Sequence, residues 1–147
     1  MVVNKKGIDL IKQFEGFRSD AYLCPANVWT IGYGNTRGLD GKPIKKGDKI
    51  TKEDAEKLLV KEVNEFAEGV KKLLKVKLNE NQFSALVSFA YNVGLGNLKA
   101  STLLKLVNLM PTSEAIYTQF LRWTKANGKE LQGLKTRRVA EANLYYF

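Results

Sequence analysis

The 147-residue sequence contains no histidine and a single cysteine, Cys24. Without histidine, the chain cannot form a Ser-His-Asp or Cys-His catalytic arrangement, a histidine general base or a histidine-ligated metal site. A single cysteine rules out an intramolecular disulfide and a cysteine-rich zinc site. Any acid–base chemistry must therefore be carried by aspartate, glutamate, cysteine, tyrosine or lysine side chains.

Long hydrophobic runs are also absent. No apolar stretch reaches the roughly 18 residues that a membrane-spanning helix requires, and residues 1–6 lack the apolar segment and cleavage site of a signal peptide. We therefore expect a soluble chain that is made in a cytoplasm and does not insert stably into a membrane. Hydrophobic residues make up 44% of the sequence, which is enough for the core of one domain or of two lobes that share a helix.

Acidic residues are scarce relative to basic ones. The chain has 15 acidic and 24 basic residues, and its formal net charge is +9. Such a surface attracts polyanions, so an anionic bacterial envelope and nucleic acid are both candidate partners. The alternative is that the chain is a basic protein with no specific partner. The lysines are scattered, and no arginine-rich run or recognition-helix motif occurs, so we do not expect a nucleic-acid partner.

The N-terminal part is expected to form one helix followed by a small sheet. Asn4 can cap a helix that extends to about Phe14, and Gly16 is placed to end it. Residues 17–35 favour short strands because they are rich in aromatic and β-branched side chains. Residues 24–27, with the sequence CPAN, are typical of a turn between two strands.

The middle of the chain is expected to be a loop and then a long helix. Residues 38–47 carry three glycines and one proline, which indicates a loop that can include a third edge strand. Thr51 begins a capping-box-like pattern, and an apolar stripe predicts a helix of about twenty residues after it. Gly69 interrupts this pattern. The helix is long enough to bridge two lobes.

Capping residues and helix breakers divide the remaining chain into four expected helices. The first three lie between Asn79 and Gly94, between Ser101 and Pro111, and from Ser113 to about Trp123, and the last helix is expected to hold Leu134 to Tyr145. Gly94 and Gly96 are both expected to end the first of these helices, and residues 126–133 are expected to be a loop. The fold class is therefore α+β and mostly helical, with a small N-terminal sheet packed at a cleft.

The most informative stretch runs from Phe14 to Asn35 and reads FEGFRSDAYLCPANVWTIGYGN. Glu15 is followed by eight residues and Cys24, and then by five residues and Thr30. This order resembles the phage-type lysozymes, the muramidase endolysins, whose catalytic pattern is Glu, eight residues, Asp or Cys, five residues and Thr. The TIGYGN segment that begins at Thr30 is also similar to that family.

Two later stretches resemble the same family. The first is LNENQFSAL at residues 78–86, continuing to AYNVG at residues 90–94. The second combines Arg122–Trp123, residues 126–128, Gly133–Leu134 and Arg137–Arg138. The resemblance covers about residues 8–144, and its motifs are specific in combination.

This resemblance implies a fold, a substrate and a site of action. The fold would be a single lysozyme-like domain over residues 1–147, with a small sheet lobe at about residues 15–50 and a larger helical lobe joined by a long helix around a cleft. The activity would be cleavage of the β-1,4 bond between N-acetylmuramic acid and N-acetylglucosamine in bacterial peptidoglycan. No metal or organic cofactor is implied, and we expect a monomer that stays in the host cytoplasm until it is released to the cell wall.

Glu15 is the candidate general acid. It is expected at the end of the first helix, near Phe14, Phe17 and Trp29. An apolar surrounding would favour the protonated carboxyl group, which keeps a proton available for the glycosidic oxygen. A charged partner such as Arg137 would instead hold the carboxyl group in place and favour its ionised form. The sequence leaves both possibilities open, and a solvated surface glutamate is the alternative to either.

Cys24 and Thr30 are the candidate residues for positioning or activating water. An inverting glycosidase usually has a second carboxylate at this point, whereas a free thiol is only slightly ionised at neutral pH. Cys24 can therefore act as a base or a nucleophile, or it can be a small packing residue. The Thr30 hydroxyl can hold a water on the sugar face opposite Glu15, or Thr30 can simply favour a strand. Asp20 does not fit the family spacing, and we expect it at the surface.

The resemblance also implies substrate contacts for Tyr33, Asn92 and Arg137. Aromatic and amide groups suit sugar faces and N-acetyl groups, while arginine suits an acidic peptide stem or the catalytic carboxyl group. Each of the three can equally be a capping or packing residue, and Trp123 is expected in the core. The alternative within glycan chemistry is a catalytically weak wall-binding module in which Cys24 marks lost activity.

Overall fold

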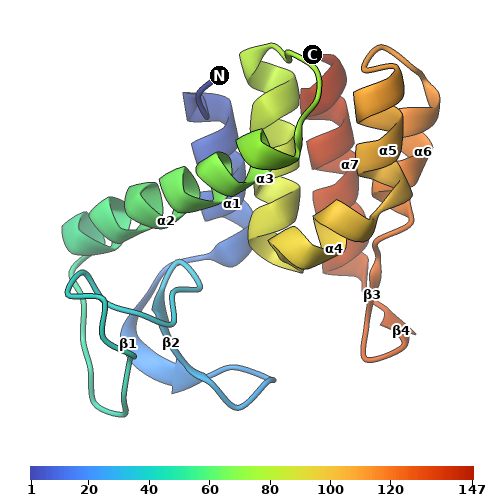
Figure 1. Cartoon of the computed structure of the whole chain (residues 1–147). Helices are drawn as coiled ribbons and strands as arrows, with labels where there is room; N and C mark the ends of the chain where they lie inside the picture. The colour runs from blue at the N-terminus through green and yellow to red at the C-terminus, as the bar shows by residue number, and fades with distance from the viewer.

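A computed structural model describes all 147 residues as a small lobe of sheet and loops below a larger lobe of helices (Figure 1). The expected class, α+β and mostly helical, is confirmed. The elements are α1 (Lys5–Glu15), β1 (Arg18–Leu23), β2 (Trp29–Gly32), α2 (Lys52–Leu73), α3 (Glu80–Val93), α4 (Leu95–Ala100), α5 (Thr102–Leu109), α6 (Ala115–Leu121), β3 (Lys125–Ala126), β4 (Lys129–Glu130) and α7 (Gln132–Tyr146).

Four helices begin at side-chain caps that the sequence predicts. Asn4, Thr51, Asn79 and Ser101 precede α1, α2, α3 and α5, and each side chain accepts a hydrogen bond from the backbone N–H three residues further on. These bonds satisfy donors that have no carbonyl partner within the helix. Local chemistry therefore fixes where these helices start.

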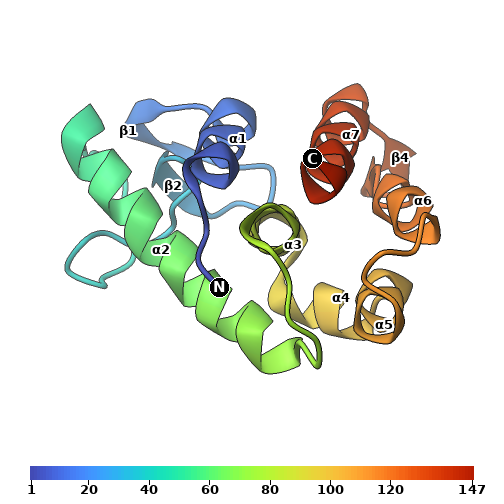
Figure 2. The same ribbon diagram turned by 90° about the horizontal axis from the view of Figure 1, so that it is seen from above.

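The hydrophobic core is built around α3. Residues 83–90 of this helix are all buried. Such a helix must be covered on every side, and Figure 2 shows α1, α2, α4 and α7 arranged around it. None of the helices is long and apolar enough to cross a membrane.

The small lobe consists of the β1–β2 hairpin and the loops up to α2. Leu23 pairs with Trp29, and Tyr22 pairs with Thr30. The hairpin turn is closed by a hydrogen bond of 3.1 Å from the Cys24 N–H to the Val28 carbonyl. The possible third edge strand in residues 38–47 does not form; this region contributes only an isolated bridge between Arg37 and Pro43. The lobe therefore depends on turns more than on sheet.

Helix α2 links the two lobes, since it starts beside the small-lobe loops and ends on the helical lobe (Figure 1). Gly69, which interrupts its apolar pattern, has a packing reason. A Cβ atom at this position would lie 2.5 Å from Cδ1 of Leu95, so glycine lets the Leu95 side chain of α4 pack directly against α2.

Three expected boundaries are wrong in the C-terminal half. Gly96 does not extend the stop after α3, because it lies inside α4, a short helix that the sequence analysis did not predict. The expected loop at residues 126–133 contains part of the β3–β4 hairpin, whereas α7 (Gln132–Tyr146) does contain the expected helix from Leu134 to Tyr145. Helix α6 is shorter than expected and covers Ala115–Leu121.

Candidate active site

Glu15 is the last residue of α1, where Gly16 ends the helix with a φ of +69°. Its side chain is 19% exposed, and its Oε2 accepts a hydrogen bond of 2.8 Å from Nη1 of Arg137 on α7. Its Oε1 faces Gly34 in the small lobe, where a Cβ atom would lie only 2.6 Å from that oxygen. The carboxyl group is thus held between the helical lobe and the small lobe.

Arg137 is itself anchored by a buried cluster of charges. Its Nε lies 3.2 Å from Oε2 of Glu141, and its Nη2 donates to the Ser88 carbonyl at 3.2 Å. Glu141 is fully buried, and it also pairs with Arg138 at 2.5 Å and accepts a hydrogen bond of 2.5 Å from the Ser88 hydroxyl. Burial raises the pKa of Glu141, and the two guanidinium groups oppose that rise. This cluster fixes the position from which Arg137 reaches Glu15.

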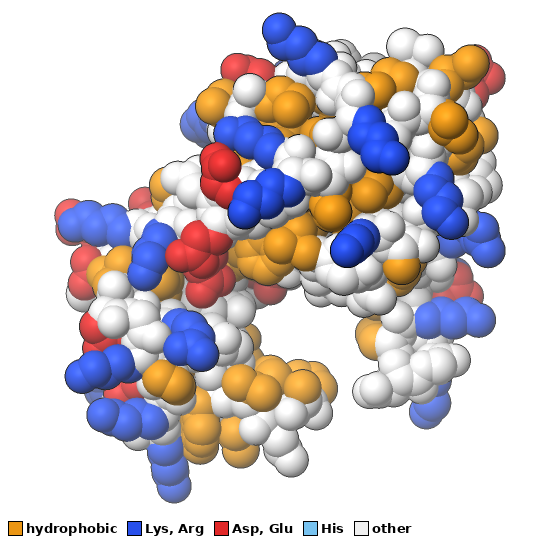
Figure 3. Space-filling model, in the orientation of Figure 1, with side chains coloured by type: hydrophobic (Ala, Val, Ile, Leu, Met, Phe, Trp, Pro, Cys, Tyr) orange, Lys and Arg blue, Asp and Glu red, His pale blue; other side chains and the backbone are white.

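A groove runs from Glu15 along the helical lobe. Its first part is a cavity of ≈ 340 Å³, lined by Phe14, Glu15, Asn92, Leu131, Gly133, Leu134 and Arg137. A second cavity of ≈ 340 Å³ shares Asn92, Leu131 and Leu134 with the first and continues to Trp123 and Lys125. In Figure 3 the molecule is deeply hollowed between the small lobe and the β3–β4 hairpin.

The turn that faces Glu15 is held by a network of polar groups. Gly32 and Gly34 have φ of +65° and +77°, and the fully buried Asn35 accepts the Tyr33 N–H at 3.1 Å through its Oδ1. The Tyr91 hydroxyl on α3 donates to the Tyr33 carbonyl at 2.9 Å and accepts from Nδ2 of Asn35 at 3.3 Å. Burial raises the pKa of Tyr91, so its phenol stays protonated and remains a donor.

A second carboxyl group, Glu62 on α2, lies at the edge of this network. Burial raises the pKa of Glu62, and the nearby Glu65 and Glu15 charges add to the rise. A hydrogen bond with the Asn35 side chain opposes it. The Tyr91 hydrogen bonds tie the turn to α3, and Glu62 places a carboxyl group of α2 beside it.

Cys24 and Thr30 come together in the β1–β2 hairpin. Hydrogen bonding from the backbone at Val28, and then at Ala26, lowers the pKa of the Cys24 thiol, and the Thr30 hydroxyl contributes in the same direction. The Thr30 hydroxyl also lies 2.9 Å from the Val28 carbonyl and donates to it. Because the hydroxyl has one proton, it cannot donate to Val28 and to the sulfur at the same time. Hydrogen bonds from the backbone, and not from the Thr30 hydroxyl, are thus the main stabilisation of a Cys24 thiolate.

Of the three predicted substrate contacts, two line the cavity beside Glu15 and the third is buried. Asn92 and Arg137 line the same cavity as Glu15, and Asn92 accepts a hydrogen bond from Arg138. The Tyr33 ring is buried against Phe17, with centroids 5.7 Å apart. This position favours the packing role that the sequence left open for Tyr33.

Two further expectations concern Asp20 and Trp123. Asp20 is exposed on β1, as expected. Trp123 is half-buried with its ring edge-on to Phe89 and also lines the groove. It therefore combines its expected packing role with a place on the groove wall.

Sequence reasoning missed the residues that hold the others in place, namely Asn35, Glu62, Ser88, Tyr91 and Glu141. One signal was available for Glu141, because it follows Arg138 by three residues and Arg137 by four, the spacing of side-chain pairs on one helix face. No local signal indicates the contacts of Ser88 or Tyr91, because their partners lie on distant segments.

Known proteins resemble this chain both in sequence and in fold. Residues 12–141 match the phage lysozyme family. The endolysin of Bacillus phage B103 is 48% identical over 99% of this chain, but the chain spans only 54% of that relative's length. Among solved structures, an endolysin from Escherichia coli O157:H7 phage FAHEc1 has a TM-score of 0.88 and 41% identity, covering 99% of this chain and 93% of the other.

A second solved structure, the muramidase domain of SpmX from Asticaccaulis excentricus, has a TM-score of 0.87 and 34% identity, covering 99% of this chain and 98% of that domain. The catalytic-pattern residues Glu15, Cys24 and Thr30 all fall within the matched segment. On sequence and on fold, this chain belongs to the phage lysozyme family.

Proposed function

We propose that this chain is a muramidase that cleaves the β-1,4 bond between N-acetylmuramic acid and N-acetylglucosamine in bacterial peptidoglycan. The observation that carries the proposal is the Glu15 carboxyl group, which lines a cavity and is held at 2.8 Å by Arg137. The similarity to proteins named endolysin and muramidase supports the choice of substrate.

Glu15 acts as the general acid. Its proton passes to the glycosidic oxygen as the bond from that oxygen to the anomeric carbon breaks, which leaves an oxocarbenium-like centre on the sugar. Arg137 fixes Oε2, so the proton is carried by Oε1. The acid is therefore held at the wall of the cavity, where a bound glycan would meet it.

Cys24 and Thr30 act on the water that completes the reaction. The water oxygen bonds to the anomeric carbon from the sugar face opposite Glu15, and its proton passes to a base. The lowered pKa of Cys24 makes its thiolate available as that base, and the Thr30 hydroxyl is next to it. If Cys24 is only a packing residue, Thr30 alone positions the water.

The test is mass analysis of purified peptidoglycan after digestion by the wild-type chain and by a Glu15→Gln variant. A muramidase leaves new reducing ends on N-acetylmuramic acid, and Glu15→Gln lowers the rate about 10²–10⁴-fold because the proton source is lost. Asp20→Asn is the matched control, since it removes an exposed carboxylate from the small lobe. Cleavage of a different bond, binding without cleavage, or an unaffected Glu15→Gln rate would contradict the proposal.

A further inference from the structure

The positive charge of the chain is unevenly distributed. Residues 1–68 hold twelve basic and eleven acidic residues, and therefore nearly balance. Residues 69–110 hold six lysines and one acidic residue, Glu80, and so contribute five of the nine net charges. A segment this asymmetric produces a local positive potential that the net charge of the whole chain does not reveal.

Five of these lysines form what we call the basic face: Lys72, Lys75, Lys77, Lys99 and Lys105. They come from the end of α2, the connection to α3, and helices α4 and α5. These elements are joined, because the Asn108 side chain on α5 bonds to the Leu73 carbonyl at 3.1 Å and to the Lys75 N–H at 2.8 Å. The close approach of Leu95 to Gly69 brings α4 against the same end of α2.

The lysines of the basic face are free to bind a partner. All five are exposed, and none takes part in an ion pair within the chain. The sixth lysine of the segment, Lys71, differs in pairing with Glu68 at 3.1 Å. Figure 3 shows separate basic side chains (Lys and Arg, blue) over the helical lobe, with few acidic ones between them. None of the five lines the cavities beside Glu15.

We propose that the basic face binds a phosphate-bearing polyanionic polymer of the bacterial cell wall, at a site separate from the glycan groove. The proposal rests on the proposed function only in placing the chain at the wall. Lysine carries a compact charge on a flexible stem, which suits irregularly spaced phosphates better than a rigid arginine fork does. Binding there holds the enzyme on the wall while the groove stays open to glycan.

Nucleic acid fits this face less well. Single-stranded nucleic acid is bound by aromatic side chains on which its bases stack. The aromatic residues of the segment are Phe83 and Phe89, which are fully buried, and Tyr91, whose hydroxyl belongs to the network near Glu15. The basic face therefore offers charge without a stacking surface.

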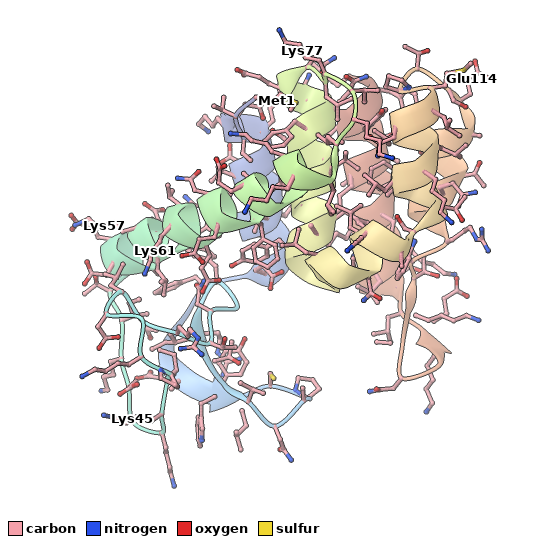
Figure 4. All side chains as sticks on the ribbon, viewed as in Figure 1. Met1, Lys45, Lys57, Lys61, Lys77 and Glu114 are labelled. Atoms are coloured by element: carbon pink, nitrogen blue, oxygen red, sulfur yellow. The ribbon has the colours of Figure 1, made fainter.

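The experiment compares two variants with the same loss of charge. The test variant carries Lys75→Gln, Lys99→Gln and Lys105→Gln, and the control carries Lys42→Gln, Lys45→Gln and Lys46→Gln. The control lysines are also exposed and without ion-pair partners. Figure 4 shows Lys45 at the far end of the small lobe and Lys77 at the opposite end of the molecule.

Binding is measured on purified cell wall with its phosphate polymers and on the same wall after chemical removal of those polymers. On the intact wall at low salt, we expect the test variant to bind at least about tenfold more weakly than wild type, and the control variant to stay within about threefold. On the stripped wall, the three proteins should bind alike. Hydrolysis of short soluble glycans should be unchanged in both variants.

Equal losses in the test and control variants, or a loss that persists on the stripped wall, would overturn the proposal. So would a larger effect of the test variant on binding to a DNA oligonucleotide than on binding to the intact wall, because nucleic acid would then be the better occupant. The soluble-glycan assay tests cleavage at the groove independently of polymer binding at the basic face. A chain that binds the polymer but cleaves no glycan would contradict the proposed function alone.

Discussion

Glu15 owes its position to residues from three distant parts of the chain. Arg137, 122 residues later, holds one carboxyl oxygen, and Gly34 leaves just enough room for the other. The sequence spacing identifies Glu15 as the candidate acid, but it cannot say which neighbour controls the carboxyl group. The structure answers that question with Arg137, whose own place depends on Glu141 and Ser88.

Cys24 offers a test of the second half of the mechanism. If its thiolate activates water, Cys24→Asp should keep lysis, since an aspartate is ionised at neutral pH, whereas Cys24→Ala should lose much of it. If Cys24 only packs, Cys24→Ala should retain the rate and Cys24→Asp should destabilise the hairpin. Lysis rates per folded protein separate the two accounts, because an alanine variant more active than the aspartate variant removes Cys24 from the mechanism.

The pH dependence gives an independent check on Cys24. A thiol with a lowered pKa becomes a thiolate at lower pH than free cysteine does, so activity should rise with pH through that lowered pKa. In Cys24→Asp this rise should vanish from the neutral range, because the carboxylate is already ionised there. A rate profile on soluble glycans that is identical in both proteins would assign the rise to another group.

At the scale of elements, the turn of residues 32–35 determines how tightly the small lobe closes on Glu15. Gly34→Ala should reduce activity by at least about tenfold, because its Cβ atom would lie 2.6 Å from the Glu15 oxygen and displace it. The positive φ of this residue should also cost about 1–2 kcal/mol of stability. Hydrolysis of soluble glycans and thermal unfolding measure the two effects separately.

Gly41 provides the matched control for this turn. Its φ of +78° is nearly the same as the +77° of Gly34, but a Cβ atom there would meet nothing within 4 Å. Gly41→Ala should therefore lose similar stability while keeping its activity. Equal losses of activity in both variants would show that strain, and not the contact with Glu15, is responsible.

The buried charges on α7 support a second prediction at this scale. Glu141→Ala leaves Arg137 and Arg138 without their shared buried partner, which should cost about 3–5 kcal/mol of unfolding free energy. Glu68→Ala, which breaks the exposed pair with Lys71, should cost less than about 1 kcal/mol. Chemical denaturation of the two variants gives the comparison, and similar losses would mean that the buried cluster contributes little to stability.

Elements with local signals were predictable, and those defined by packing were not. Asn4, Thr51, Asn79 and Ser101 mark helix starts because each side chain bonds to its own first turn. Helix α4 escaped prediction because Gly94 and Gly96 are typical stop signals, and its N-terminus has no side-chain cap. Its place is set by packing of Leu95 and Leu98 against the rest of the helical lobe, which local sequence does not show.

At the scale of the whole molecule, the sequence predicts a small sheet at a cleft and a helix long enough to bridge two lobes, and the resemblance adds the division into a sheet lobe and a helical lobe. It does not predict the groove that leads from Glu15 to Trp123, because that groove is shaped by residues from α1, α3, α7 and the β3–β4 hairpin. Long-range contacts of this kind carry no periodic or capping signal.

The charge of the whole molecule leads to the last prediction, which concerns salt. A net charge of +9 should concentrate the enzyme on an anionic wall, and interactions between exposed charges are screened beyond about 8 Å at physiological ionic strength. Under the proposed function, hydrolysis of short soluble glycans needs only the groove and has no such attraction to lose. Activity on bacterial cells should therefore fall more steeply with added salt than activity on soluble glycans.

Parallel rate measurements on the two substrates over one salt series provide the test. The inference about the basic face sharpens it, because the variant of Lys75, Lys99 and Lys105 should show a shallower fall on cells than the control variant of equal charge. If cells and soluble glycans respond alike to salt, the positive charge serves something other than attachment to the wall. If both variants flatten the salt response equally, net charge rather than the basic face governs attachment.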